Sequence, residues 1–372
     1  MQQKPNWYTI KDIDQLDSPA LVIYPERVKE NIRRAVDMIG DVSRLRPHIK
    51  THKTKEAAQL MLAAGIQKFK CATIAEMEML GQCNAPDVLL AYQPLGPKFI
   101  RFVSVLLKYR NTHYTCLVDN IEAARNIAGI TASAGKSMRV YIDLNVGQNR
   151  TGIIPGDAAM ELYEYCARTE GITVLGFHAY DGHIRNKDFT ERTQACHEAF
   201  AKVESMKKAV MEKGYPEPVI IAGGSPTFSI HCKRKNIECS PGTFVFWDKG
   251  YTDLCPEQPF EPAALLVTRV ISLPDARRIC LDLGHKSVSA ENEIGSRVFF
   301  PEAQQLKPLG QSEEHLVLEA GAGHHFKPGD VLYGIPFHVC PTVALYERAI
   351  TIEDGKISGE WMIVARDRKI TI

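Results

Sequence analysis

The sequence contains no apolar run that approaches the roughly 18 residues needed to cross a bilayer as a helix. Its first residues are mixed and charged, without the apolar segment of a secretory signal. Net charge is nearly absent too, because 45 basic residues face 44 acidic ones and leave a formal charge of +1. A nucleic-acid or anionic-membrane partner would require a basic stripe. We therefore expect no membrane partner and no nucleic-acid partner.

CxxC pairs are missing as well, although the chain has ten cysteines. A chain of 372 residues, 45% of them hydrophobic, can bury a large core and needs no disulfide scaffold. Scattered, reduced thiols are typical of a cytosolic protein. The sequence therefore predicts a cytoplasmic protein of about two domains.

Eight strand candidates lie in the first two thirds of the chain, from 20–24 to 218–224. Amphipathic segments that suit helices, such as 28–40 and 54–65, lie between them. This alternation predicts a parallel sheet, and the count of eight favours a closed (β/α)8 barrel of the TIM type over an open doubly wound sheet.

The pattern changes after about residue 256, where strand candidates follow one another without intervening helices. Consecutive strands joined by Gly and Pro turns indicate an antiparallel β domain. The expected fold class is therefore α/β, with a TIM-like barrel at 17–255 and an antiparallel β domain at 256–372. We expect residues 1–16 to pack on the second domain.

Barrel enzymes keep their reactive groups where strands end, and RPHIKTHK (46–53) closes the strand candidate at 44–50. Side chains alternate along a strand, so Arg46, His48 and Lys50 are expected on one face. Desolvation and nearby like charge are expected to lower the pKa of Lys50, and a lysine with a lowered pKa can form a Schiff base with an aldehyde. Lys53 is the competing candidate, and a solvated basic cluster is the alternative interpretation.

Two glycine-containing turns follow the last strand candidates of the barrel. AGGSPTF (222–228) and PGTF (241–244) offer backbone N–H groups and hydroxyls that suit a phosphate. Arg150, in another glycine-bracketed loop, is a candidate for holding an anionic oxygen or, equally, a surface arginine. The hydroxyls of the first turn are Ser225 and Thr227, and the second turn contributes Gly242 and Thr243.

His338 and Cys340 lie two residues apart at the end of DVLYGIPFHVC. In an extended segment such residues project from the same face, as two ligands of one metal must. Imidazole with thiolate suits zinc better than magnesium or manganese. Two protein ligands would leave positions open for a substrate. A chance HxC pattern with a structural role is the alternative.

These motifs together resemble the D-threonine aldolase and D-serine dehydratase group of fold-type III pyridoxal-phosphate (PLP) enzymes, relatives of alanine racemase. The resemblance implies a PLP-binding barrel, a β domain, an active site between them and a homodimer. It assigns the covalent PLP linkage to Lys50, the phenolic oxygen to Arg150, the pyridine ring to Tyr180 and the metal to His338 and Cys340. It also implies that the phosphate is held by five residues of the two turns, Gly223, Gly224, Ser225, Gly242 and Thr243. The matching motifs are RPHIKTHK, VGQNRTG, HAY, AGGSPTF, PGTFVFWD, LDLGHKSVSAE and HVCPTV.

The chain departs from the family pattern at two places. Some aldolases of the group carry an aspartate where this chain has Cys340, which is similar to the zinc-dependent dehydratases. His183 is the candidate base for the β-hydroxyl, but it lies closer to Tyr180 than the family pattern implies, and Asn186 stands at the more usual place.

The resulting hypothesis is a lyase that acts on small D-β-hydroxy amino acids with PLP and a divalent metal, zinc before manganese or magnesium. A D-threonine aldolase, giving glycine and acetaldehyde, is preferred. A D-serine or D-3-hydroxyaspartate dehydratase, giving a keto acid and ammonia, is the alternative. An amino acid racemase with a base such as Tyr346, and a PLP-binding protein without catalysis, are the remaining interpretations.

Overall fold

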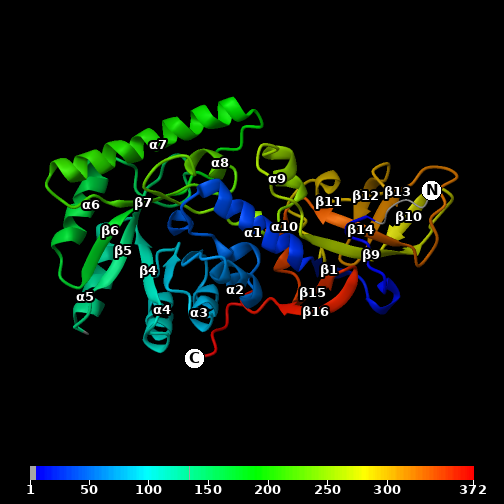
Figure 1. Ribbon diagram of the computed structural model, residues 1–372, viewed down its shortest axis with the longest axis horizontal. Coiled ribbons are helices and arrows are strands. Elements are labelled where there is room, and N and C mark those ends of the chain that lie inside the picture. The colour runs from blue at the N-terminus through cyan, green and yellow to red at the C-terminus, as the bar shows by residue number, and fades with distance from the viewer. Residues whose placement is uncertain (1–5, 134) are drawn as a thin grey trace. The chain divides into compact units, whose positions relative to one another are not determined.

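The computed structural model of the chain describes residues 6–133 and 135–372, which fold into two units (Figure 1). The first, which we call the barrel unit, consists of Ala35–Lys50, Ala58–Gly242 and Asp367–Ile372. The second, the β unit, consists of the described residues as far as Arg34, Thr51–Ala57 and Thr243–Arg366. The chain passes between the units several times, and the domain ranges 17–255 and 256–372 stay a prediction.

Seven parallel strands form the sheet of the barrel unit, in the order β2-β3-β4-β5-β6-β7-β8. The segment 45–48 closes the sheet into a barrel, because Leu45 forms a parallel bridge to Cys239 of β8 and His48 forms one to Lys70 of β2. The expected barrel class is thereby confirmed. The strands are β2 (Lys68–Cys71), β3 (Asp87–Leu90), β4 (His113–Val118), β5 (Met138–Asp143), β6 (Ile172–Ala179), β7 (Val219–Ala222) and β8 (Ile237–Cys239).

Two of the expected barrel strands are wrong. The segment at 20–24 forms β1 (Ala20–Ile23), which belongs to the β unit and pairs with strands there. The segment at 44–50 is no regular strand, because two 3₁₀ turns, Val42–Arg44 and Ile49–Thr51, leave only isolated bridges between them. The sequence analysis also missed β8, which has only three residues and too few apolar positions to show a strand period.

Helices connect the parallel strands and lie outside them (Figure 1), as parallel pairing requires a long crossover. Side-chain caps set several starts: Thr73 accepts from the Glu76 N–H before α3, and Asp188 accepts from the Glu191 N–H before α7. The helices are α1 (Pro25–Ile39), α2 (Lys55–Ala63), α3 (Ile74–Gln82), α4 (Pro97–Lys108), α5 (Ile121–Ser133), α6 (Asp157–Arg168), α7 (Phe189–Glu212) and α8 (Phe228–His231).

The core of the barrel unit includes a cluster of Leu89, Leu117, Tyr141 and Ile221, contributed by β3, β4, β5 and β7. Leu117 also lines the cavity described below, so this core and that cavity share a wall. The position of the cluster follows from parallel register, which brings the inward residues of different strands to the same level.

The β unit holds a mostly antiparallel sheet in the order β12-β13-β10-β9-β1-β15-β16, with β14 paired to β9 and β11. This agrees with the expected antiparallel β domain, except that β1 and β15 run parallel. Besides β1, its elements are β9 (Ala264–Ser272), β10 (Arg278–Leu281), β11 (Val298–Phe299), β12 (Lys307–Gln311), β13 (Leu316–Glu319), β14 (Val331–Pro336), β15 (Arg348–Glu353), β16 (Lys356–Met362), α9 (Lys249–Leu254) and α10 (Val339–Val343).

The N-terminal segment packs on this sheet, as far as it is described. Tyr8, Ile10 and Leu16 belong to one buried cluster with residues of β1, β9 and β14, such as Val22 and Leu265. The expectation for residues 1–5 lies outside the described part of the chain.

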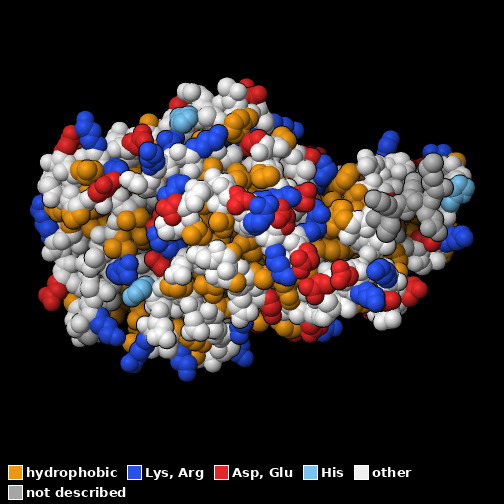
Figure 2. All heavy atoms as spheres, viewed as in Figure 1, with side chains coloured by type: hydrophobic (Ala, Val, Ile, Leu, Met, Phe, Trp, Pro, Cys, Tyr) orange, Lys and Arg blue, Asp and Glu red, His pale blue; other side chains and the backbone are white. Residues whose placement is uncertain are grey.

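Charges of both signs are interspersed over the face drawn in Figure 2. None of the helices within residues 6–133 and 135–372 combines the length and the apolar character that a membrane span requires.

Candidate active site

Lys50 lies in the 3₁₀ turn Ile49–Thr51, not on a strand as expected. Its backbone N–H donates to His48 Nδ1 at 3.4 Å. Arg46, expected on the same face, is instead buried and bound to carboxylates, with Nε donating to Glu238 at 2.7 Å and Nη1 to Asp87 at 2.6 Å. The correction has a physical reason: a buried guanidinium requires paired carboxylates, and these lie on β8 and β3.

A cavity of about 380 Å³ opens in the barrel unit beside Lys50. Three of its cationic groups surround one ring: Lys50 Nζ, Lys70 Nζ and Arg150 Cζ lie 5.9, 5.6 and 5.1 Å from the ring centroid of Tyr180. The structure thus brings three predicted residues, Lys50, Arg150 and Tyr180, into one cavity. Its other lining residues are His48, Ala72, Ala91, Tyr92, Gln93, Leu117, Asp143, Thr151 and His178.

This cavity contains a buried relay that the sequence analysis missed. Lys70 Nζ lies 3.3 Å from His178 Nε2, and His178 Nδ1 lies 2.7 Å from Asp143 Oδ1. Burial, together with the charge of Lys50, lowers the pKa of Lys70 to about 7. His178 belongs to the HAY motif, which was a signal for it in the sequence. Lys70 lies on the inward face of β2, and no local motif marks it. We call these three residues the Lys70 relay.

The charges within the relay favour a neutral imidazole on an ionised carboxylate. Burial lowers the pKa of His178, and nearby Lys70 lowers it further. Burial alone would raise the pKa of Asp143, but the bond and charge of His178 together with the bonds from Thr151 and Gln93 outweigh it, and the pKa is lowered. Asp143 also accepts from Thr151 Oγ1 at 2.8 Å and from Gln93 Nε2 at 3.1 Å.

The predicted phosphate loop after β7 approaches the tyrosine closely. Gly223 has a φ of +79°, and a Cβ at Gly224 would lie 2.9 Å from Cε2 of Tyr180. Ser225 Oγ accepts from the Gly242 N–H at 3.2 Å, which joins the two predicted loops. Thr243, the fifth predicted ligand, begins a 3₁₀ turn of the β unit. The glycines leave bare backbone, the feature that suits a phosphate.

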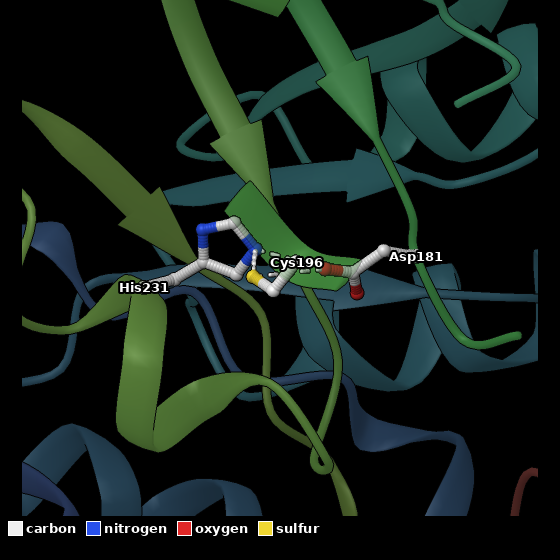
Figure 3. Close-up of side chains that lie close together, drawn as sticks. All are labelled: Asp181, Cys196 and His231. Carbon is white, nitrogen blue, oxygen red and sulfur yellow. Dashed lines mark hydrogen bonds and ion pairs between the residues drawn. The ribbon is translucent and has the colours of Figure 1, made fainter. Parts of the chain in front are cut away.

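A second buried group is bonded to this loop, and Figure 3 shows three of its side chains, Asp181, Cys196 and His231, close together. Asp181 accepts from Thr227 Oγ1 and lies 2.8 Å from His231 Nε2, and Cys196 Sγ lies 3.3 Å from the same nitrogen. Thr227 in turn accepts from the Gly224 N–H at 3.3 Å. We call Asp181, Cys196, Thr227 and His231 the Asp181 cluster. Sequence reasoning missed it, because its members come from the loop after β6, from α7, and from α8 with its cap.

Asp181, Cys196 and His231 are a group of three donors, within the described chain, whose spacing would suit a metal ion. All three are buried, and burial raises the pKa of the Cys196 thiol to about 12. Hydrogen bonds inside the cluster already use the facing donor atoms. The cluster is therefore well explained as a support of the loop.

His183, the predicted base for the β-hydroxyl, is exposed and lies against the VGQNR loop. A Cβ at Gly147 would come within 2.6 Å of His183 Nε2. His183 is not among the residues that line the cavity. Its catalytic role stays a prediction.

The predicted metal ligands lie at the start of a short helix rather than along a strand. His338 is the N-cap of α10, and Cys340 is in its first turn, so the expected strand alternation is wrong. Asp248 fixes this start, because its Oδ2 accepts from the Val339 N–H at 3.0 Å. The side chains still meet, since His338 and Cys340 are hydrogen-bonded.

Glu291 completes this group, with a carboxylate oxygen bonded to Nδ1 of His338. Burial disfavours the charged imidazole, but Cys340 and Glu291 outweigh it and raise the pKa of His338 to about 9. A carboxylate on one ring nitrogen is the common support of a metal-binding histidine. An imidazole beside a thiol therefore fits zinc. Glu291 ends the LDLGHKSVSAE motif, which was a signal for it in the sequence.

Comparison with known proteins matches two families to this chain. The alanine racemase N-terminal domain matches residues 23–249, more than half of the chain, and a putative serine dehydratase domain matches residues 263–352. The chain belongs to the fold-type III PLP family of alanine racemase-like enzymes. The D-threonine aldolase and D-serine dehydratase branch proposed from the motifs is confirmed.

Individual relatives cover nearly the whole chain. D-threonine aldolase of an Arthrobacter species is 27% identical over 95% of this chain and 93% of its own. D-threo-3-hydroxyaspartate dehydratase of Delftia sp. HT23 is 25% identical over 89% of this chain and 93% of its own. The solved D-threonine aldolase of Filomicrobium marinum has a TM-score of 0.88 at 24% identity, over 98% of this chain and 99% of that one.

Proposed function

We propose that this protein is a PLP- and metal-dependent lyase of the D-threonine aldolase type, which cleaves D-threonine to glycine and acetaldehyde. The observation that carries the proposal is the cavity in which Lys50, Arg150 and Tyr180 meet. The relative with 27% identity over 95% of the chain is an enzyme of this activity.

The residues of the cavity fit PLP by their chemistry. Lys50 offers an amine for its aldehyde, Arg150 a cation for its phenolic oxygen, and Tyr180 a ring face for its pyridine. The loop at Gly223–Ser225, with Gly242 and Thr243, offers N–H groups and hydroxyls for its phosphate. When bound, PLP supplies the electron sink for the bond broken at Cα.

His338 and Cys340 would hold the divalent metal, with Glu291 orienting the imidazole. Such a cation acts as a Lewis acid on a substrate oxygen. Zinc is preferred over manganese or magnesium because of the N and S donors. A cysteine-to-alanine variant of a D-threo-3-hydroxyaspartate dehydratase has been solved in a metal-free form.

Dehydration is the second candidate, and Cys340 favours it. A D-serine or D-3-hydroxyaspartate dehydratase would release a keto acid and ammonia from the same binding site. A racemase is disfavoured, because the Tyr346 hydroxyl already donates to the Ser287 carbonyl at 2.7 Å and burial raises the pKa of Tyr346.

The deciding experiment assays products from D-threonine and D-serine, with and without chelator. We expect glycine and acetaldehyde from D-threonine, lost on chelation and restored by zinc. Keto acid and ammonia as main products would replace the aldolase with the dehydratase. No turnover of either D-amino acid would contradict both.

A second experiment tests the attachment site. Borohydride reduction of the holoenzyme and peptide mapping should find the cofactor on Lys50, and the Lys50→Met variant should carry no label. A label on another lysine would overturn the assignment. Homodimerisation and a cytoplasmic location stay predictions, and sedimentation of the holoenzyme would measure the former.

A further inference from the structure

Lys70 is a buried lysine for which the proposed reaction has no role so far. Only 2% of its surface is exposed, although it lines the cavity beside Lys50. A buried ammonium is costly unless it is paired and hydrogen-bonded. Among residues 6–133 and 135–372 no carboxylate bonds it directly, and its Nζ lies 3.3 Å from a histidine nitrogen. A lysine so placed is expensive to keep for packing alone.

The hydrogen bonds around His178 specify where the protons lie. Asp143 is an acceptor, so Nδ1 of His178 carries the hydrogen and donates to Oδ1. Nε2 then has a lone pair and accepts from Lys70 Nζ. This arrangement ties one N–H of Lys70 to the relay and leaves the rest of its amine for the cavity.

The groups that face Lys70 come from several elements. Four of them are basic: Arg46 and His48 in the segment 45–48 that closes the barrel, Lys50 just after it, and Arg150 after β5. The others are Asp143 on β5, His178 on β6, and Tyr180 and Asp181 after β6. Arg46 and the two aspartates are already bound to partners of opposite charge or to histidines. Lys50 and Lys70 therefore remain as two amines at one aromatic ring.

We propose that Lys70 is a positioning residue for the cofactor, and that the Lys70 relay sets the pH at which the cofactor linked to Lys50 gains its proton. This inference rests on the proposed function for the attachment at Lys50. Its physical basis is electrostatic: a positive charge on Lys70 in this poorly solvated cavity disfavours a second positive charge on the cofactor linked to Lys50.

Two substitutions of Lys70 should act in opposite directions. Lys70→Met removes the competing base, so the linked cofactor should gain its proton at a pH about one unit higher. Lys70→Arg keeps a permanent positive charge, so the midpoint should fall by about one unit. A role in packing alone would move both variants alike or neither.

The measurement is the visible absorbance of the bound cofactor, titrated from pH 5 to 10 in purified holoenzyme. Lys68→Met is the matched control, because Lys68 lies on the same strand and face but is bound to Glu238. We expect this control to shift the midpoint less than Lys70→Met. His178→Gln should move the midpoint in the same direction as Lys70→Met, because loss of the imidazole that accepts from Lys70 makes the charged amine less favourable.

Borohydride mapping is done on the same samples. Midpoints of Lys70→Met and Lys70→Arg that equal the wild-type value, with the label still on Lys50, would overturn the role of Lys70 and leave the proposed function standing. A wild-type label that is absent from Lys50 would instead overturn the proposed function. If Lys70→Met does not fold, Lys70→Arg and His178→Gln still decide, and unchanged midpoints in both would count against the inference.

Discussion

The barrel unit contains two buried Asp–His pairs with nearly the same geometry but different surroundings. Asp143–His178 is 2.7 Å long and continues to Lys70 in an open cavity. Asp181–His231 is 2.8 Å long and continues to Cys196 and Thr227 within the protein interior. The same pair thus adjoins a cavity at one place, where we propose that it acts on the cofactor, and supports a loop at the other. Burial and hydrogen bonding alone do not identify a catalytic histidine.

The two pairs resemble each other electrostatically. Burial would raise the pKa of each aspartate, yet its histidine and its other hydrogen-bond donors together outweigh this and lower the pKa in both. They differ in the surroundings of the histidine's neighbour: Lys70 lines the cavity, whereas Cys196 has no exposed surface.

The largest expected effect is on stability. Asp181→Asn should lower the free energy of unfolding by about 3–5 kcal/mol, because it breaks a buried pair that also anchors Thr227. Asp143→Asn should cost less, about 1–2 kcal/mol, since water in the cavity can replace a lost partner. Urea denaturation of the two variants measures the difference. Equal losses of unfolding free energy in the two variants would contradict the distinction between the Asp181–His231 pair, which is closed off from solvent, and the Asp143–His178 pair beside the cavity.

Metal content should separate the Asp181 cluster from the predicted metal ligands. Cys340→Ala should lower zinc affinity at least tenfold, by an order-of-magnitude estimate for a lost ligand. Cys196→Ala should leave bound zinc unchanged. Elemental analysis after dialysis against a weak chelator measures both. A loss of zinc confined to Cys196→Ala would place the metal in the Asp181 cluster instead.

Acid titration should show the contribution of the sealed pair directly. The folded pKa of Asp181 is below its ordinary value of 3.8, so its contribution is present above that pH and disappears as pH falls through the folded pKa. Wild type and Asp181→Asn should therefore differ most above pH 5 and converge toward pH 3. Stability measured by denaturation at each pH tests this, and parallel curves down to pH 3 would contradict it.

Thiol labelling is the smallest expected effect. Cys196 has no exposed surface and its thiol pKa is raised to about 12, so iodoacetamide should leave it unmodified in the folded protein. Cys340 is only half-buried and should react first once metal is removed. Mass spectrometry of the peptides gives both rates. Alkylation of Cys196 at the rate of Cys340 would show that the cluster opens.

Motifs in the sequence predicted a substantial part of the candidate site. Lys50, Arg150 and Tyr180 come from separate motifs and line one cavity, and His338 does meet Cys340. The local geometry around Lys50 and around His338 and Cys340 was predicted wrongly, because a 3₁₀ turn and a short helix replace the strands on which alternation was assumed. Lys70 and Glu291 had no assigned role, since each acquires its partner from a distant part of the chain.

The sequence by itself determined the alternation of strands and helices, the change to an antiparallel sheet, and the motifs that mark the family, because these depend on periodicity and on neighbours along the chain. The tertiary structure alone decided which segment closes the barrel, which lysine is buried, and which of two Asp–His pairs faces a cavity. Those outcomes depend on the register between strands far apart in sequence, and register sets which side chains meet and how much water reaches them.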